Sequence, residues 1–332
     1  MRLFANANYD FLGYQKRAFI FAGAVILVGL VMMFVNGVRY SVEFTGGTLV
    51  QFQTRAPADV SAIRAALTAQ GMQGAEIQQF GSNREFVIRA LTAKAGTDAD
   101  DTQATSAAVT AALNQAVGNG QYTIDRTEAV GPKVGSELRT QALWLVLLSF
   151  IAVLIYLAFR FEWRFAVAAV IATAHDVIST IAFIGMTRIE ISLFVVGGIL
   201  SIVGYSLNDT IVVLDRVREN LRKHKASDFG VLLNRSINET LPRTFFTGTT
   251  ALGSLIALAA LGGDVVRGFA LVMLYGVIIG TFSSIFIAAP VLLWIENRWP
   301  GAAVKQLRAP SKRPPAPTAG TGAPGRKTQP VA

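Results

Sequence analysis

Six long apolar runs alternate with polar segments along this chain of 332 residues. Each run has eighteen or more residues and few charges, which is the length that a helix needs to cross a bilayer. The runs predict transmembrane helices at residues 18–35, 140–159, 165–187, 191–214, 244–263 and 268–295. This pattern is typical of a polytopic α-helical membrane protein with six transmembrane helices and both termini on one side.

Residues 39–137, between the first two runs, have the composition of a domain outside the bilayer, with ten acidic and eight basic residues. Alternation, helical spacing and turn residues predict strands at 41–52, 75–80, 85–91 and 122–130 and helices at 57–70, with Pro57 in its first turn, and 98–117. The resulting order, β-α-β-β-α-β, predicts a ferredoxin-like α+β domain between the first and second transmembrane helices. We expect a bulge or tight bend at Gly46 and Gly47. No catalytic cluster accompanies this domain, which favours a binding platform over an enzyme.

Basic residues orient the chain. Three lie near the amino end, two in residues 160–164 and seven in residues 215–243, against one each in the loops that hold Arg188 and Arg267. Because the basic side of a membrane protein faces the cytoplasm, we expect cytoplasmic termini and a periplasmic domain. A cleavable signal peptide is the alternative for the first run, but its apolar part is long for a signal peptide, which favours a retained helix.

The predicted organisation has four parts. They are an N-terminal segment with the first helix at 1–38, the periplasmic domain at 39–137, a five-helix membrane bundle at 138–297 and a disordered cytoplasmic tail at 298–332. Within the bundle, a cytoplasmic amphipathic loop at 215–243 is expected to form a surface helix or hairpin. Its apolar side chains Val231, Leu232, Leu233 and Ile237 are expected to face lipid or the bundle.

Composition limits the chemistry. The chain is 52% hydrophobic and 15% charged, has no cysteine and has only two histidines, which excludes disulfides and thiolate metal sites and argues against a histidine-rich one. We therefore expect no cofactor. The net charge of +9 is concentrated in loops and the tail beside apolar runs, where membrane topology and anionic lipid account for it better than nucleic acid does.

Asp209 is the only charge in the apolar run 191–214, within a polar cluster that includes Tyr205, Ser206 and Asn208. An ionised carboxylate there costs about 2.5 to 3.5 kcal/mol, so it should face the bundle interior. Asp209 lies about 9 Å inside the cytoplasmic boundary, and Arg243 begins the next run from the same side. The two are candidates for an ion pair. Static helix contacts for the carboxylate, and a simple anchoring role for the arginine, are the alternatives.

The same helix carries small and polar residues at three- and four-residue spacing. Gly198, Ser201, Ser206 and Asp209 are expected to form one strip suited to close helix contact or a wet path. His175 and Asp176 form a second polar site near the membrane midplane. These two residues could take part in a proton pathway or form a buried structural pair.

Several motifs together resemble the SecF family of bacterial protein-export membrane subunits, in the resistance-nodulation-division superfamily. The longest is YSLNDTIVVLDRVREN at 205–220, and the others are FTGGT at 44–48, VGPKVG at 130–135, AHDV at 174–177 and TLPRT at 240–244. Glu43 departs from the Asp that the family commonly has before its Phe-Thr-Gly-Gly motif.

The resemblance implies a non-enzymatic subunit of the bacterial inner membrane that works with SecD beside the SecYEG channel, often with YajC. Such a pair uses the proton-motive force to promote the late translocation of unfolded exported polypeptides, after the SecA motor has acted. The family's proton-path carboxylate and arginine correspond to Asp209 and Arg243, and we include Asn208, Asp176 and His175 in the predicted pathway. The alternatives are a proton-coupled exporter of small molecules or lipids from the same superfamily, and a passive membrane scaffold.

Overall fold

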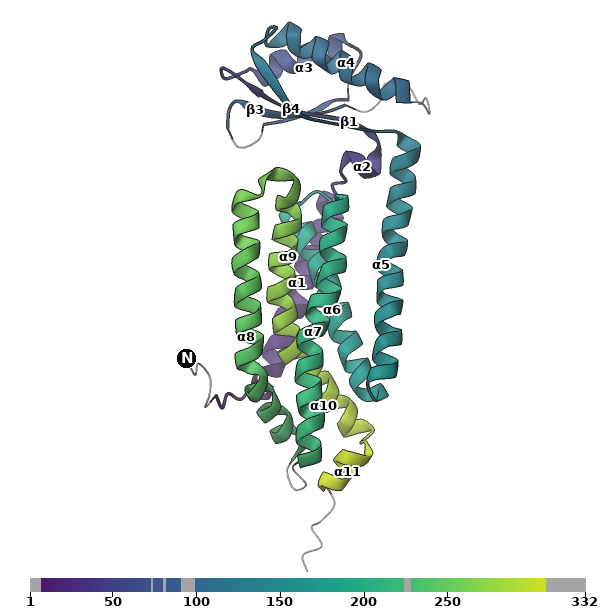
Figure 1. Cartoon of the computed structure of the whole chain (residues 1–332), viewed down its shortest axis with the longest axis vertical. Coiled ribbons are helices and arrows are strands. Elements are labelled where there is room, and N and C mark those ends of the chain that lie inside the picture. Colours follow the sequence, from purple (N-terminus) through teal and green to yellow (C-terminus); the bar gives the residue numbers. More distant parts are fainter. Residues whose placement is uncertain (1–6, 73, 80–81, 91–98, 224–227, 309–332) are drawn as a thin grey trace, which may run out of the picture.

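The computed structural model describes residues 7–72, 74–79, 82–90, 99–223 and 228–308. A bundle of long helices lies beneath a small sheet (Figure 1). Six helical segments in these residues are long and apolar enough to cross a membrane: Leu12–Asn36, Lys133–Arg160, Trp163–Thr187, Leu193–Lys223, Phe229–Leu261 and Val266–Arg298. They confirm the six predicted spans, and every segment is longer than the apolar run that predicts it.

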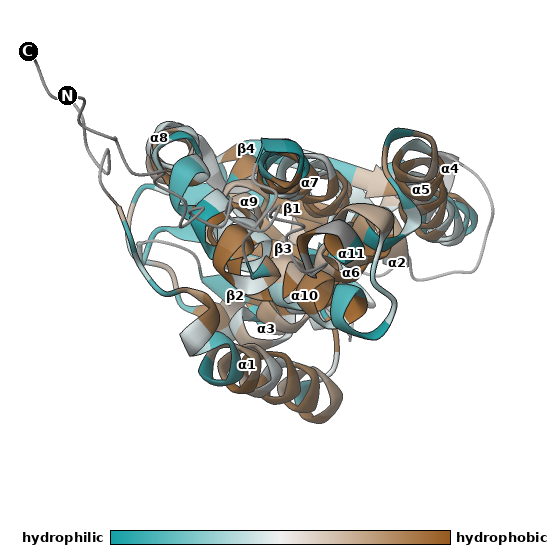
Figure 2. Cartoon of the chain, turned by 90° about the horizontal axis from the view of Figure 1, so that it is seen from below, coloured by the Kyte–Doolittle hydropathy of each residue, from teal (hydrophilic) through white to brown (hydrophobic). Residues whose placement is uncertain are grey.

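Three helices form the centre of the bundle and three surround it. The central ones are α6 (Trp163–Thr187), α7 (Leu193–Lys223) and α9 (Gly263–Ser283), which is continued by the π-helix η2 (Ser284–Ala288) and α10 (Ala289–Arg298). More than half of the apolar window of each central span is buried, against 11 to 17% in α1 (Gln15–Asn36), α5 (Pro132–Arg160) and α8 (Phe229–Leu261). Figure 2 shows α1 and α5 at separate edges of the bundle and hydrophobic along much of their length. These faces suit contact with lipid acyl chains.

The segment 215–243 continues two of the membrane helices. The helix α7 runs to Lys223, and α8 begins at Phe229, where the Asp228 carboxylate accepts a hydrogen bond from the Gly230 N–H. The segment is thus a helical hairpin whose residues 224–227 lie outside the described residues. Of the four apolar side chains predicted to face lipid or the bundle, Leu232, Leu233 and Ile237 are buried and Val231 is 65% exposed.

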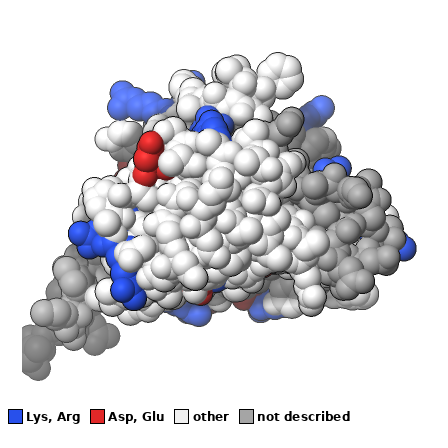
Figure 3. Space-filling view, turned by 90° about the horizontal axis from the view of Figure 1, so that it is seen from above, with Lys and Arg blue, Asp and Glu red and all other residues white. Residues whose placement is uncertain are grey.

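Four antiparallel strands form the sheet in the order β2-β3-β1-β4. They are β1 (Gly47–Thr54), β2 (Glu76–Gln79), β3 (Glu85–Ala90) and β4 (Tyr122–Val130), and they alternate with α3 (Val60–Ala69) and α4 (Ala99–Ala116) in the predicted order β-α-β-β-α-β. We call this part, residues 42–130, the sheet domain. Figure 3 shows that its outer surface, seen from above, carries few charged side chains away from the rim.

Alternate residues of β1 and β3 are buried on one face of the sheet, which α3 and α4 cover. Phe52 and Phe86 are completely buried and stacked, with their ring centroids 5.6 Å apart. They pack against Ile63 of α3 and Leu113 of α4. The opposite face of the sheet is directed toward the helical bundle (Figure 1).

Two sequence predictions for this domain need correction. Residues Val42–Thr45, predicted to begin the first strand, form the one-turn helix α2. The backbone at Gly46 and Gly47 has φ angles of +73° and +125°, so the predicted bend separates α2 from β1. The first domain helix starts at Val60, not at Pro57, because Asp59 caps it by accepting a hydrogen bond from the Ser61 N–H.

The sheet domain is attached to the loop between α6 and α7. The Ser41 N–H donates to the Ile191 carbonyl at 3.0 Å, and the Ile191 N–H donates to the Arg39 carbonyl at 2.8 Å. The Glu43 carboxylate accepts a 2.6 Å hydrogen bond from the Leu193 N–H. Arg89 of β3 forms an ion pair with Glu190. The Glu43 carboxylate therefore joins the domain to the first turn of α7.

The chain after the last span is folded at its beginning. Residues Ala302–Arg308 form α11, although the sequence predicts a disordered tail from 298. Val304 and Leu307 are buried against the bundle, and this apolar contact stabilises the short helix. Residues 309–332 lie outside the described residues.

Candidate functional site

Asp209 lies inside the helical bundle and is 2% exposed. The Thr281 hydroxyl of α9 donates a hydrogen bond of 3.4 Å to its Oδ2 atom. The buried strip on α7 runs through Gly198, Ile202, Ser206 and Asp209, whereas the predicted member Ser201 is exposed. A carboxylate in this position has little access to solvent, and its protonation depends on the groups that surround it.

Arg243 lies on α8, close enough to attract Asp209 electrostatically. The described residues include no ion pair between these two side chains, although depth matching makes them candidates for one. The Arg243 side chain is exposed at the surface of the bundle. The structure therefore holds the two charges near each other but not in contact, an arrangement in which a small helix movement changes their attraction.

Asp176 on α6 is completely buried and connects the three central helices. Its Oδ2 atom accepts hydrogen bonds from Ser206 of α7 and from Ser283 of α9, the latter at 2.7 Å. Its Oδ1 atom lies 2.9 Å from Nδ1 of His175. The two predicted polar sites of the bundle thus meet at α7, because Ser206 lies one helical turn from Asp209.

Not every predicted residue joins this cluster. Asn208 is exposed on the outside of α7, about 100° around the helix from its neighbour Asp209. Three further atoms inside the bundle are buried without a hydrogen-bond partner among the described residues: Nε2 of His175 and the hydroxyl oxygens of Tyr205 and Thr210. Buried polar atoms normally have partners, so these atoms are available to water or to a moving proton.

The hydroxyl groups of α9 were not predicted from the sequence. Thr281 and Ser283 belong to the stretch GTFSS inside the last apolar run, whose polar residues were the available signal. The π-helix η2 begins at Ser284, the last residue of this stretch, and holds five residues in the wider π turn. Pro290 accounts for that turn, because proline has no N–H and its ring conflicts with the carbonyl four residues earlier. Such π turns are frequent at functional sites.

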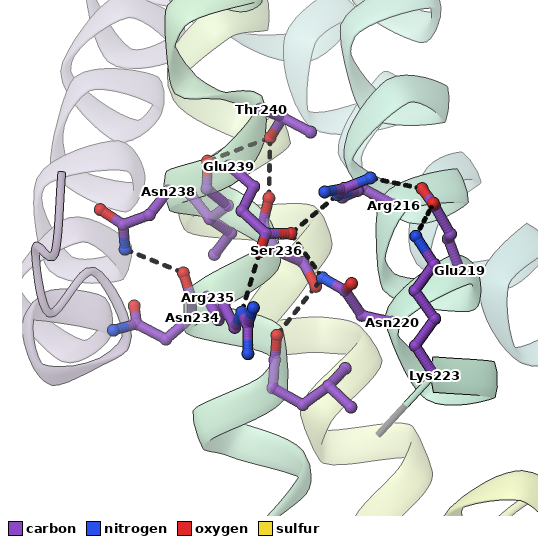
Figure 4. A network of polar contacts seen from close by, with 12 residues as sticks. Arg216, Glu219, Asn220, Lys223, Asn234, Arg235, Ser236, Asn238, Glu239 and Thr240 are labelled. Carbon is purple, nitrogen blue, oxygen red and sulfur yellow. Dashed lines mark hydrogen bonds and ion pairs between the residues drawn. The ribbon is translucent and has the colours of Figure 1, made fainter. Parts of the chain in front are cut away.

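A second polar network joins α7 to α8 beyond Asp209 (Figure 4). Glu239 of α8 accepts hydrogen bonds from Nε of Arg216 and Nδ2 of Asn220, both at 2.7 Å, and from Nε of Arg235 at 2.8 Å. Glu239 precedes Arg243 by one helical turn. Pro242, inside α8, lies between the two. The network therefore holds the part of α8 before Pro242 against α7, whereas Arg243 follows Pro242 and is not part of the network.

The N-terminal segment also binds to this end of α8. The Tyr9 N–H donates to Oδ1 of Asn238 at 2.8 Å, and the Phe11 N–H donates to Oδ1 of Asn234 at 2.9 Å. Both amide groups donate in return to the Tyr9 carbonyl at 2.9 Å. Two asparagines at helical i, i+4 spacing thus hold the backbone that precedes α1.

Comparison with known proteins agrees with these features. Residues 109–298 match the family model for the protein export membrane protein SecD/SecF, C-terminal, and residues 31–58 match the SecD/SecF GG motif. The chain is 53% identical over 304 residues to the protein translocase subunit SecF of Gemmatimonas aurantiaca, which covers 90% of this chain and 91% of that protein. It is 38% identical to the Escherichia coli O157:H7 subunit of the same name, over 86% of this chain and 87% of that protein.

Among solved structures, the chain is similar to SecDF from Thermus, a translocon-associated membrane protein, with a TM-score of 0.77 and 33% identity. The similarity covers 90% of this chain but 40% of the Thermus chain, so this chain spans less than half of that protein. The residues matched by the two family models include α7, which carries Asp209, and the glycine pair Gly46 and Gly47. By these similarities, the chain belongs to the SecF family of protein translocase subunits.

Proposed function

We propose that this chain works with a SecD-type partner to convert the proton-motive force into late translocation of exported polypeptides. The observation that carries the proposal is the arrangement of Asp209. It is a buried carboxylate that accepts a hydrogen bond from Thr281, and Arg243 on the next helix lies near it without forming an ion pair within the described part of the chain. An acid inside a membrane helix is by default a functional group. Because the counterion is close but does not form an ion pair with the carboxylate, the carboxylate can change between its charged and its protonated form.

In the proposed cycle, a proton from the outer side reaches Asp209 and neutralises it. The attraction between α7 and α8 through Arg243 then disappears, and release of the proton to the other side restores it. One charge that crosses a potential of 100 mV exchanges about 2.3 kcal/mol, enough to shift a two-state equilibrium about fifty-fold. Asp176, Ser206 and His175 extend the polar path toward the membrane midplane in this proposal.

We further propose that the sheet domain is a ferredoxin-like periplasmic domain and that both termini are cytoplasmic. The bonds between this domain and the start of α7 support the idea that helix movement is passed to the domain. The match covers 40% of the Thermus SecDF chain, and the remaining length of that chain supports a SecD-type half as the partner. SecYEG, YajC and the unfolded polypeptide remain the proposed neighbours in the inner membrane.

The experiment is a reconstitution of the chain with its SecD partner and the translocation channel in proteoliposomes. Late translocation of a stalled polypeptide is measured with and without an imposed proton gradient. We expect Asp209→Asn to keep membrane abundance and partner binding but to lose the gradient-dependent part. The matched control is Asp215→Asn, which removes one carboxylate six residues further along α7, where it is 39% exposed. Full gradient dependence in Asp209→Asn would contradict the proposal.

A further inference from the structure

A cavity of about 370 Å³ lies between the sheet domain and the helical bundle. Residues on the uncovered face of the sheet form its roof, among them Arg89 of β3 and Arg126 of β4. Its floor consists of the loop between α6 and α7, the first turn of α7, and residues 267–271 of α9. The cavity therefore lies at the level where three membrane spans end.

Arginines dominate the lining of this cavity: Arg39, Arg89, Arg126, Arg188 and Arg267, against the three carboxylates Glu43, Glu128 and Glu190. All three carboxylates have partners within the protein. Glu190 pairs with Arg89, Glu128 pairs with Arg126, and Glu43 accepts hydrogen bonds from the Ser41 hydroxyl and the Leu193 N–H. The excess charge of the cavity is positive.

The other three arginines are available for a ligand. Within the described part of the chain, Arg39, Arg188 and Arg267 form no ion pair and donate no side-chain hydrogen bond, and all three are exposed. Arg89 adds a further donor, because its Nε–H is buried and has no acceptor among the described residues. A buried guanidinium donor without an acceptor is unfavourable, so the site favours an anionic oxygen.

Apolar side chains lie directly beside these donors. Phe194 in the first turn of α7 is 44% exposed, and Ile189 and Leu271 also line the cavity. Arg188 follows the last residue of α6. Cations at the end of a membrane span with exposed apolar groups next to them match an amphiphile whose phosphate lies above its acyl chains.

We propose that this cavity binds the phosphate of an anionic phospholipid from the leaflet next to the sheet domain. Arg188 and Arg267 bind the phosphate oxygens from the floor, Arg39 contributes from the linker after α1, and the buried Nε–H of Arg89 donates from the roof. Guanidinium groups suit this role because they present paired donors to phosphate oxygens. The acyl chains lie along Phe194 and Leu271. The lipid then connects the sheet domain to the bundle.

The test is a titration of the purified full-length chain in detergent with phosphatidylglycerol or phosphatidylcholine, in which native mass spectrometry counts the bound lipids. One arginine near the membrane surface contributes about fivefold in affinity, so Arg188→Gln combined with Arg267→Gln is expected to weaken one phosphatidylglycerol site about 25-fold. The matched control combines Arg55→Gln with Arg64→Gln, which removes the same charge from exposed positions of the sheet domain outside the cavity. Lipid sites at the opposite end of the bundle are the same in both variants.

An affinity of the cavity variant within twofold of the control would overturn the proposal. Displacement of the lipid by inorganic phosphate alone, at tens of millimolar, would assign the cavity to free phosphate and reject the lipid. Displacement by an acidic peptide at equal affinity would assign it to a polypeptide. Should the double variant fail to fold, Arg39→Gln, in the linker after α1, gives the same comparison with an expected fivefold loss.

Discussion

Ser283 of α9 donates a 2.7 Å hydrogen bond to Asp176 of α6, and neither side chain has solvent-exposed surface. Ser206 of α7 donates to the same carboxylate oxygen. The Asp176 carboxylate therefore links the three central helices. Asp176→Ala removes the acceptor of hydrogen bonds from two buried hydroxyl groups. We expect a loss of about 2 to 4 kcal/mol of unfolding free energy, measured by thermal unfolding in detergent. The control Asp215→Ala removes a half-buried acid of α7 that pairs with Arg160 near the surface, and equal midpoints for the two variants would exclude this role for Asp176.

Asp209 and Arg243 are expected to act as one unit. Arg243→Met should lose gradient-driven translocation as Asp209→Asn does, because the buried acid then has no cation to respond to. The double variant should be no worse than either single variant, since residues that act together are not additive. The measurement is the rate of gradient-driven translocation for all four proteins. Independent, multiplying losses would show that the two residues have separate roles.

Close packing of α7 on α9 depends on a glycine. A Cβ atom on Gly276 would lie 2.2 Å from Cγ1 of Ile202, whose side chain is buried, with 1% exposed. We therefore expect Gly276→Ala to destabilise the bundle by about 1 to 3 kcal/mol. Gly253→Ala is the matched control on α8, because a Cβ there meets nothing within 4 Å. Thermal unfolding of the two variants checks the prediction, which fails if their midpoints agree.

Membrane orientation can be tested by labelling single cysteines, since the chain has none of its own. Cysteine at position 188 or 267 should react with an impermeant reagent added to intact spheroplasts. Cysteine at position 222 should react only after the membrane is opened. These outcomes follow from the distribution of basic residues. Labelling of position 222 from outside would reverse the proposed topology.

Attachment of the sheet domain should depend on pH through Glu190. Burial raises the pKa of this carboxyl above its ordinary value, although Arg89 opposes the shift. The attached state therefore holds the proton more tightly than a detached state with an ordinary carboxyl, so attachment strengthens as the pH falls through the raised pKa. Spin labels at positions 84 and 187 should report a larger fraction of short distances at low pH. Glu190→Gln should remove this dependence, and an unchanged pH profile in that variant would contradict the assignment.

The sequence predicts those parts of the fold that depend on local composition. Apolar runs long enough to span a bilayer are rare in soluble domains, and Asp209 and Asp176 are conspicuous because charges are rare in such runs. Alternation in residues 41–45 was misleading, because the one-turn helix α2 depends on a contact with α5 that is distant in sequence. Gly135 of α5 approaches Gly46 so closely that a Cβ atom would lie 2.9 Å from its backbone nitrogen.

The partners of the candidate site could not be predicted from the sequence. Thr281 and Ser283 come from the last span, and hydroxyl side chains are common in membrane helices, so nothing local distinguishes these two. Asn208 adjoins Asp209 in the polar cluster of the sequence, yet neighbours on a helix point about 100° apart. Matched depth brings Arg243 near Asp209 but says nothing of whether their side chains meet.

The contact between Gly46 and Gly135 also has a meaning for the architecture of the whole chain. Gly47 pairs with Val130 in the sheet, so the strands that begin and end the sheet domain leave it side by side. A domain whose two ends meet is an insertion that the host helices accommodate without spreading apart. The chain thus enters and leaves the domain at one pair of glycines, while Glu43 and Arg89 hold it to the start of α7 and to the loop before it. With its two ends this close, a domain of another size could be joined to the same two helices without separating them.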